Sequence, residues 1–350
     1  MTTTTTKIDI RALHKEDLLE WFLANGEKRF RANQVYQWLW QKGAHGFEEM
    51  TNLSKDLRAK LVEHFVINGI QEDQVQKSAD GTIKTRFRLH DGHLIESVLI
   101  PVPDAKRFTV CVSSQVGCSL TCKFCATGKM KRVRNLTAAE IVDQVVLVNK
   151  QAEETFGHPL TNIVYMGMGE PLLAYKSVLK SVEHITSSEG LNMSPKRITV
   201  STAGIAKMIK KLADDEVKFN LALSLHAADD KKRNEIMPIN EQNNLSVLME
   251  ALIYFSEKTK NKISYEYIAF QNFNDSFIDA ANLAKLCRHF PVRINIIEYN
   301  PIDGAVFEKS AAHRIDDFAK YLIDEGVMVT VRRSRGKDID AACGQLANKG

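Results

Sequence analysis

The sequence lacks long apolar runs, an apolar leader and a dense set of cysteines. It has no stretch of about 18 apolar residues, so we expect no membrane-spanning helix. The start, Met1-Thr-Thr-Thr-Thr-Thr-Lys7, has no apolar core of a secretory signal, which predicts a cytoplasmic protein. Six cysteines in 350 residues are too few for a disulfide scaffold. In a reducing compartment, grouped cysteines are typical of metal binding or chemistry.

The remaining composition is that of an ordinary globular protein with a mild positive charge. The net charge of +4 permits nucleic-acid binding without demonstrating it. Any single basic cluster is typical of a solvated surface, but three of them beside the motifs described below favour contact with RNA. These clusters are Lys28-Arg29-x-Arg31, Lys129-x-Lys131-Arg132-x-Arg134 and Arg332-Arg333-x-Arg335-x-Lys337.

The chain is long enough for one large domain and a smaller one. Residues 1–80 are predicted to form a helical accessory domain that binds RNA, because Leu57 and Leu61 recur at helical spacing. Residues 81–108 are predicted to form a β-hairpin extension, with its turn at Asp91-Gly92. We expect a catalytic domain over residues 109–334 and a C-terminal tail over residues 335–350.

Residues 109–334 alternate between short β-branched runs and helical patterns. One helix begins with the capping box Thr137-Ala-Ala-Glu140. Repeated strand–helix units imply a parallel sheet, here an α/β partial (β/α)6 barrel whose site lies at the carboxyl ends of the strands. The predicted strands are residues 109–113, 162–166, 197–201, 220–225, 262–269 and 292–299, with a seventh at 327–332.

The strongest motif is Cys118-Ser-Leu-Thr-Cys122-Lys-Phe-Cys125, directly after the first barrel strand. Structural zinc sites use four ligands, so a zinc site would need Cys111 as its fourth. Three thiolates on a four-iron cluster instead leave one iron open. S-adenosylmethionine (SAM) can chelate that iron and be split to a 5′-deoxyadenosyl radical. We therefore favour a cluster over zinc.

This motif resembles the signature of the radical SAM superfamily. Two further segments are similar to the RlmN type of RNA adenine C2 methyltransferase: Cys111-Val-Ser-Ser-Gln-Val-Gly-Cys118 and Arg335-Gly-x-Asp-Ile-Asp-Ala-Ala-Cys343-Gly-Gln-Leu346. Phe30-Arg-Ala-x-Gln-Val-x-x-Trp38 resembles the accessory helical domain of that family. The resemblance implies one [4Fe-4S] cluster on Cys118, Cys122 and Cys125, and two SAM molecules per turnover.

The segment from Asn162 to Pro171 is predicted to be a strand that ends in a glycine turn. Glycine lets the backbone approach a ligand closely, although such a glycine pair alone also fits a plain strand–helix turn. His226 alone also fits a core histidine. The resemblance implies SAM contacts at Gly169, Glu170, Ser201, Ser224, Leu225, His226 and Asn300.

Adenine C2 is electron-poor and cannot attack the SAM methyl group as an ordinary nucleophile. The resemblance implies that Cys343 first accepts a methyl group, which is then made a radical and adds to C2. Cys343 lies among small residues after a basic run, which predicts a lowered pKa for its thiol. Without the resemblance, an idle thiol on a loose tail is the simpler interpretation.

Two more residues receive roles from the resemblance. Glu96 would accept the C2 proton, and its apolar neighbours in the sequence would raise its proton affinity. Cys111 would release the product through a transient disulfide with Cys343. Because Cys111 alternates with Val110 and Val112, a core cysteine is the alternative.

The sequence departs from the family loop at Lys131-Arg132, where a Gly-Phe pair is usual. The resemblance implies that the substrates are 23S rRNA near the peptidyl transferase centre and, in some members, tRNA beside the anticodon. An electron donor such as flavodoxin or ferredoxin is expected, and the protein is expected to be a monomer. A methyltransferase of the same family that acts on adenine C8, and a non-catalytic iron–sulfur protein that binds RNA, are the alternatives.

Overall fold

The computed structural model describes residues 7–304 and 306–349, and its centre is one ten-stranded sheet. The strand order is β14-β13-β12-β11-β10-β9-β6-β5-β4-β3. Within this sheet the strands β6 and β9 to β14 pair in parallel, whereas β3, β4 and β5 extend the sheet as an antiparallel edge. The strands are β3 Gln71–Lys77, β4 Ile83–Arg88, β5 Leu94–Val102, β6 Arg107–Cys111, β9 Asn162–Tyr165, β10 Ile198–Thr202, β11 Asn220–Ser224, β12 Ile263–Ala269, β13 Val292–Glu298 and β14 Met328–Arg332.

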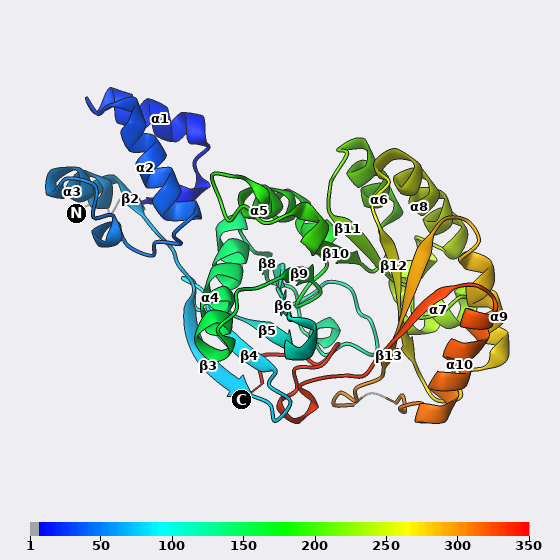
Figure 1. Cartoon of the computed structure of the whole chain (residues 1–350). Helices are drawn as coiled ribbons and strands as arrows, with labels where there is room; N and C mark the ends of the chain where they lie inside the picture. Colours follow the sequence, from blue (N-terminus) through cyan, green and yellow to red (C-terminus); the bar gives the residue numbers. More distant parts are fainter. Residues whose placement is uncertain (1–6, 305, 350) are drawn as a thin grey trace.

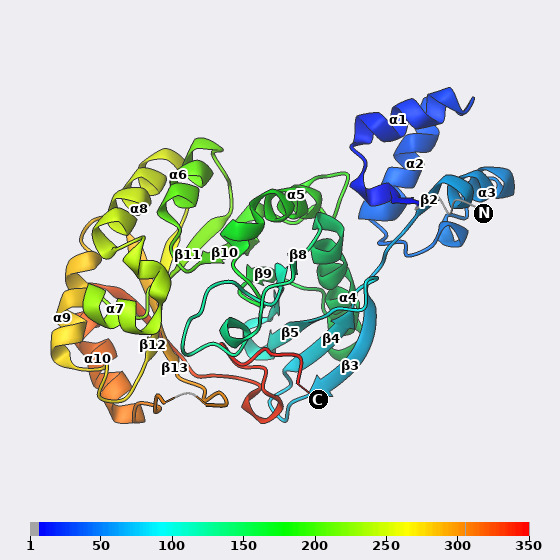
Figure 2. The same ribbon diagram turned by 180° about the vertical axis from the view of Figure 1, so that it is seen from behind.

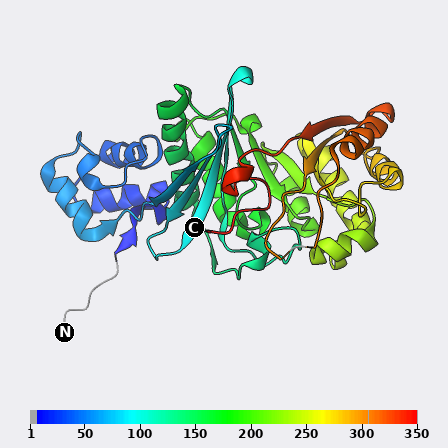
Figure 3. The same ribbon diagram turned by 90° about the horizontal axis from the view of Figure 1, so that it is seen from below.

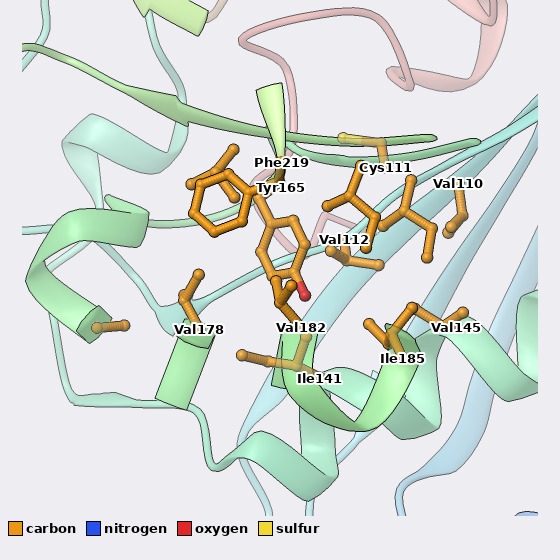
Figure 4. Packing of buried hydrophobic residues seen from close by; sticks show 14 of the residues in the cluster. Val110, Cys111, Val112, Ile141, Val145, Tyr165, Val178, Val182, Ile185 and Phe219 are labelled. Atoms are coloured by element: carbon orange, nitrogen blue, oxygen red, sulfur yellow. The ribbon is translucent and has the colours of Figure 1, made fainter. Parts of the chain in front are cut away.

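The parallel part confirms the predicted α/β partial barrel, with helices wrapped around its outer side (Figures 1 and 2). Each strand alternates its side chains, so one set of residues packs against the helices. Figure 4 shows Val112 pointing toward the apolar layer around α4 and α5, whereas the sulfur of Cys111 points away from it. The covering helices are α4 Ala138–Phe156, α5 Tyr175–Thr186, α6 Ala206–Asp214, α7 Asp230–Ile236, α8 Leu245–Thr259, α9 Phe277–Leu286 and α10 Ala312–Asp324.

The N-terminal residues form a separate group of helices beside α4 and α5 (Figure 1). It comprises α1 Lys15–Ala24, α2 Arg29–Trp40 and α3 Lys55–His64, closed by a short pairing of β1 Ile8–Asp9 with β2 Phe65–Val66. A buried ion pair of 2.7 Å joins Arg11 to Asp143 of α4. The ring of Trp40 stacks on His184 of α5 at a centroid distance of 3.5 Å. These contacts fix the helical group against the barrel. Among the helices of the described residues, none has the length and apolar character to cross a membrane.

The helical prediction, which extends to residue 80, is wrong at its end, because Gln71–Lys77 forms strand β3. Its sequence, QEDQVQK, has almost no apolar residues, so its own pattern does not favour a strand. Antiparallel pairing with β4 decides its conformation, and its side chains stay largely outside the core at the edge of the sheet.

The C-terminal tail returns from β14 and crosses beside the hairpin of β4 and β5 (Figure 3). The carboxylate of Asp80 accepts a hydrogen bond of 2.9 Å from the Gly336 amide. Asp338 accepts one of 2.6 Å from the Ser78 hydroxyl. Arg335 donates to the carbonyl of Pro101 at 2.6 Å. The tail is therefore ordered by polar contacts and not loose.

The start of α4 offers a direct test of the capping prediction, which the structure confirms. The Thr137 hydroxyl accepts from the Glu140 amide at 3.1 Å, and Glu140 accepts from the Thr137 amide at 2.8 Å. We expect Thr137→Ala to lower the free energy of unfolding by about 1 kcal/mol, because an amide of the first turn loses its acceptor. Urea unfolding would measure this, with the exposed Thr51→Ala as the control. Equal midpoints for the two variants would contradict the prediction.

Candidate active site

Cys118, Cys122 and Cys125 lie in one loop between β7 (Gln115–Val116) and the short 3-10 helix η4 (Thr127–Lys129). All three are half-buried. The sulfur of Cys118 accepts a hydrogen bond of 3.4 Å from the Leu120 amide. The amide of Lys123 donates at 3.0 Å to the carbonyl of Ile236, which anchors the loop to the end of α7.

These three thiols form a donor set that fits an iron–sulfur cluster. Burial raises the pKa of Cys118 to about 11, and the charge of Cys125 adds to the rise. Within residues 7–304 and 306–349, however, no three His, Cys, Asp or Glu side chains converge closely enough to hold one metal ion. In a cluster each thiolate binds its own iron, so the three need not converge on one point.

The glycine turn after β9 packs tightly against the strand that leads to this loop. A Cβ atom at Gly167 would lie 2.8 Å from the backbone of Val112, and one at Gly169 would lie 2.5 Å from the side chain of Gln115. Gly169 also has a φ of +98°, which disfavours other residues. The turn therefore brings Glu170 close to the cysteine loop, and only glycine fits these positions without rearrangement.

Glu170 joins the ends of β9 and β10. Its carboxylate accepts hydrogen bonds from the amides of Ala203 at 2.7 Å and Leu172 at 3.0 Å. Burial raises the pKa of this carboxyl group to about 7, although both hydrogen bonds oppose the rise. Each oxygen keeps a further lone pair, so the carboxylate can still accept a bond from an ammonium group.

The other residues predicted to contact SAM lie at the same edge of the sheet. Ser201 is near the end of β10, and its hydroxyl donates to the Tyr165 carbonyl at 2.7 Å. Ser224 ends β11, Leu225 and His226 follow it, and Asn300 lies two residues beyond β13. Parallel strands bring these positions together because their carboxyl ends share one edge. The structure therefore brings these residues to one edge of the sheet. Their contacts with SAM remain a prediction.

His226 links this edge to the cysteine loop. It has a φ of +54° and is buried, and its Nδ1 accepts a hydrogen bond of 3.1 Å from the Ile268 amide. Burial lowers its pKa to about 3, so the ring is neutral and the proton is assigned to Nε2. The ring meets Phe124 edge to face at 4.7 Å, and Phe124 precedes Cys125.

Arg233 is a residue of this region that the sequence patterns did not identify. It has no exposed surface, and its guanidinium donates to the carbonyls of Leu225 at 3.0 Å and Ala203 at 2.6 Å. A further bond of 2.6 Å reaches Asn240. Burial lowers its pKa to about 10, and Cys122 opposes that change. The run Asp229-Asp-Lys-Lys-Arg233 looks like a solvated helix face, and only the helical spacing of Arg233 to Ile236 and Met237 signals burial.

We expect Arg233→Met to lower the free energy of unfolding by about 3 kcal/mol and to weaken SAM binding. Several buried carbonyl groups at the strand ends would lose their donor. Urea unfolding and calorimetric titration with SAM would measure the two effects. Lys231→Met, on the exposed face of the same helix, is the control. A variant with unchanged stability would show that these carbonyls do not need the guanidinium.

Cys343 is held beside the cysteine loop by the tail. The amide of Ala126 donates to the Gly344 carbonyl at 2.7 Å, and the hydroxyl of Thr127 donates to the Leu346 carbonyl at 2.6 Å. Both bonds are made by the residues that directly follow Cys125, and their acceptors lie one and three residues after Cys343. The tail therefore places Cys343 at the predicted cluster site.

The predicted lowering of the Cys343 pKa is wrong. The residue is exposed in part, but the protein atoms around the thiol remove water from it and raise its pKa to about 12. The charges of Cys125 and Glu266 raise this pKa further. Of these neighbours, Arg332 is the one whose charge lowers the pKa of Cys343, as expected from the basic run. Most of the basic run points elsewhere: Arg333 and Lys337 pair with Glu298, and Arg335 binds backbone carbonyls.

The apolar surroundings predicted for Glu96 are also wrong. Glu96 is 1% exposed, but Lys84 lies 3.5 Å from its Oε1 atom. Its Oε2 atom accepts hydrogen bonds from the tail amides of Ala347 at 2.9 Å and Asn348 at 3.1 Å. Its neighbours along the strand are mostly apolar, but the polar partners of Glu96 come from β4 and from the tail, which the local sequence does not show.

Cys111 ends β6 and is buried, and burial raises the pKa of its thiol to about 12. The charge of Cys343 adds to that rise. All six cysteines are free, so the structure contains no disulfide and the expected Cys111–Cys343 bond is not formed in it. Lys131 and Arg132, which depart from the family loop, are exposed, and Lys131 pairs with Cys118 as a β-bridge.

Comparison with known proteins agrees with this geometry. Residues 8–67 match the "Ribosomal RNA large subunit methyltransferase N-terminal domain", and residues 112–284 match the "Radical SAM superfamily". A crystal structure of a radical SAM methyltransferase from Sphaerobacter thermophilus is similar with a TM-score of 0.92 and 40% identity, over 98% of this chain and 100% of that one.

Two curated relatives are similar over nearly their whole lengths. A probable dual-specificity RNA methyltransferase RlmN of Cytophaga hutchinsonii is 58% identical, over 100% of this chain and 96% of the relative. One of the same name from Flavobacterium psychrophilum is 57% identical, over 98% of both chains. The radical SAM fold, the three-cysteine loop and this identity together show that the chain belongs to the RlmN family of radical SAM RNA methyltransferases.

Proposed function

We propose that this enzyme methylates C2 of one adenine in 23S rRNA at the peptidyl transferase centre, and of the adenine beside the anticodon in tRNA. The dual-specificity name of its relatives supports both substrates. The observation that carries the chemistry is the docking of the tail, in which the Gly344 carbonyl accepts from Ala126 and so holds Cys343 beside the cysteine loop. A plain RNA-binding protein has no use for that arrangement.

Cys118, Cys122 and Cys125 would hold one [4Fe-4S] cluster with one iron open to SAM. When bound, the cluster and SAM supply a 5′-deoxyadenosyl radical after one electron arrives from a donor such as flavodoxin or ferredoxin. Glu170 would accept a hydrogen bond from the SAM ammonium group, and the neighbouring strand ends would bind the rest. The remaining contacts are Gly169, Ser201, Ser224, Leu225, His226 and Asn300. Two SAM molecules would be used per turnover, one of them as the methyl source.

Three side chains would carry the methyl group to C2. The Cys343 thiol loses its proton, and the thiolate then takes the methyl group from one SAM, which leaves as S-adenosylhomocysteine. After one hydrogen atom is removed from this S-methyl group, its carbon bonds to C2, and Glu96 accepts the C2 proton. The Cys111 thiolate then attacks the Cys343 sulfur, which breaks the bond from Cys343 to the transferred carbon and leaves a disulfide between the two cysteines. The released carbon takes up a proton and becomes the methyl group, and the one electron left unpaired by the addition to C2 would return to the redox centre that supplied it. The electrostatic influence of Cys343 on the Cys111 thiol, whose pKa it helps to raise, supports the disulfide step.

RNA would contact the N-terminal domain, proposed as residues 1–80, and the basic clusters near the barrel. Lys28, Arg29 and Arg31 of the first cluster are exposed or half-buried, which suits contact with phosphates. Residues 81–108 would link this domain to the barrel of residues 109–334, and residues 335–350 would be the tail. The target adenine must leave its stack to reach the strand ends. We propose that the enzyme acts as a monomer in the cytoplasm.

Anaerobic incubation with SAM, a reductant and unmodified RNA tests the proposed function. Digestion and mass spectrometry should reveal 2-methyladenosine at one position in 23S rRNA and one in tRNA. Finding 8-methyladenosine instead would favour the C8 enzyme of the family. An absence of 5′-deoxyadenosine would favour a non-catalytic protein that binds RNA. A modified rRNA with unmodified tRNA would contradict the dual specificity.

A further inference from the structure

Lys84 is a buried ammonium group that the proposed mechanism does not yet use. Its side chain is 4% exposed, and its Nζ atom lies 3.5 Å from Oε1 of Glu96 and 3.5 Å from the carbonyl of Asp340. A lysine is almost never buried without a partner, because desolvation of its charge is costly. Its partner here is the residue proposed as the base, and its second contact is the tail that carries Cys343.

The register of the sheet places Lys84, Glu96 and Cys111 on one face. Lys84 lies directly opposite Val98 of β5, and Val98 lies directly opposite Cys111 of β6. Directly paired residues share a face of a sheet, and so do residues two apart in one strand. Glu96 is therefore the diagonal neighbour of both Lys84 and Cys111 on the face that the tail crosses.

The two oxygens of Glu96 have different surroundings. Oε2 is occupied by the amides of Ala347 and Asn348, which ties the carboxylate to the tail. Oε1 is buried and has no hydrogen-bond partner, with Lys84 as its neighbour at ion-pair distance. Oε1 is therefore the oxygen that is free to receive a proton.

We propose that Lys84 is a positioning residue for the base: its ammonium group pairs with the buried Glu96 carboxylate and directs Oε1 toward the C2 proton. Burial of a charged carboxylate is costly unless a cation compensates it, and Lys84 is the cation at ion-pair distance from Oε1. In the step itself, the C–H bond at C2 breaks, its electron pair stays on the substrate, and the proton bonds to Oε1. This inference rests on the proposed function.

The test replaces Lys84 with methionine and follows the C2 proton. RNA deuterated at adenine C2 gives a kinetic isotope effect on 2-methyladenosine formation, which grows when proton removal limits the rate. For Lys84→Met we expect kcat to fall about 100-fold with little change in KM, and the isotope effect to rise above that of the wild type. Methylation of Cys343 should continue. Lys84→Arg, which keeps the charge, should recover part of the rate.

A stabilising role alone would give a different pattern. Lys84→Met would then have a lower unfolding midpoint, with an unchanged isotope effect in the fraction that stays folded, and that result would overturn the proposal. Unchanged kcat would overturn it equally. Lys77→Met, in the exposed edge strand β3, is the matched control. Glu96→Gln separates the role of Lys84 from the proposed role of Glu96 as the base. Full activity in that variant would refute the assignment of Glu96 as the base, whatever Lys84→Met shows.

Discussion

Cys343→Ala is expected to abolish RNA methylation, with a loss of at least about 1,000-fold in 2-methyladenosine formation. The transferred carbon would have no sulfur to carry it, and C2 of adenine is too electron-poor to take a methyl group directly from SAM. The backbone contacts around this position, from Ala126 to Gly344 and from Thr127 to Leu346, do not involve the thiol. The variant should therefore keep its fold. Mass spectrometry of the digested RNA measures the loss.

Cys287→Ala is the matched control for this variant. Cys287 follows α9 and is half-buried on the outer side of the barrel, away from the predicted site, so its removal should leave methylation unchanged. Substantial 2-methyladenosine from Cys343→Ala would show that the methyl group reaches the base by another route. The proposed roles of Cys111 and Glu96 would then also need revision.

Local sequence was sufficient for the parts of the molecule whose structure is local. The seven β-branched runs became strands β6 and β9 to β14, because apolar side chains on both faces of a buried parallel strand leave a clear pattern. The capping box at Thr137 formed as predicted because its partners are three residues apart. The cysteines at positions 118, 122 and 125 share one loop for the same reason.

The environment of the site could not be predicted, because its partners come from distant parts of the chain. Along β4, charged residues alternate with other residues, a pattern typical of a strand with one face in water, and Lys84 belongs to the charged set. The tail, more than 250 residues later, nevertheless covers that face. The same tail supplies the amides that bind Glu96. Arg233 lies in a charged run, and its acceptors are the ends of strands that precede it. Long-range contacts such as these carry no signal in a local pattern.

Cys118→Ala is expected to remove the bound cluster and, with it, all SAM cleavage. Two thiolates would remain where a cluster with one open iron needs three, so iron should fall from about four atoms per chain to a small fraction of that. Neither 5′-deoxyadenosine nor 2-methyladenosine should form. Iron and sulfide analysis of anaerobically purified protein, together with chromatography of the SAM products, measures both effects.

Cys111→Ala separates loss of the cluster from loss of a buried thiol. Cys111 belongs to strand β6 and not to the loop, so this variant should keep its iron and its SAM cleavage while failing to release methylated RNA. If Cys118→Ala retained a full complement of iron, a fourth ligand would have to replace it. Cys111 would then be the nearest candidate by sequence, and the zinc-type ligand set that includes it would have to be reconsidered. If Cys111→Ala keeps its iron while Cys118→Ala loses it, the four-cysteine ligand set is excluded. Cys111 would then not be needed to bind the iron, whereas Cys118 would.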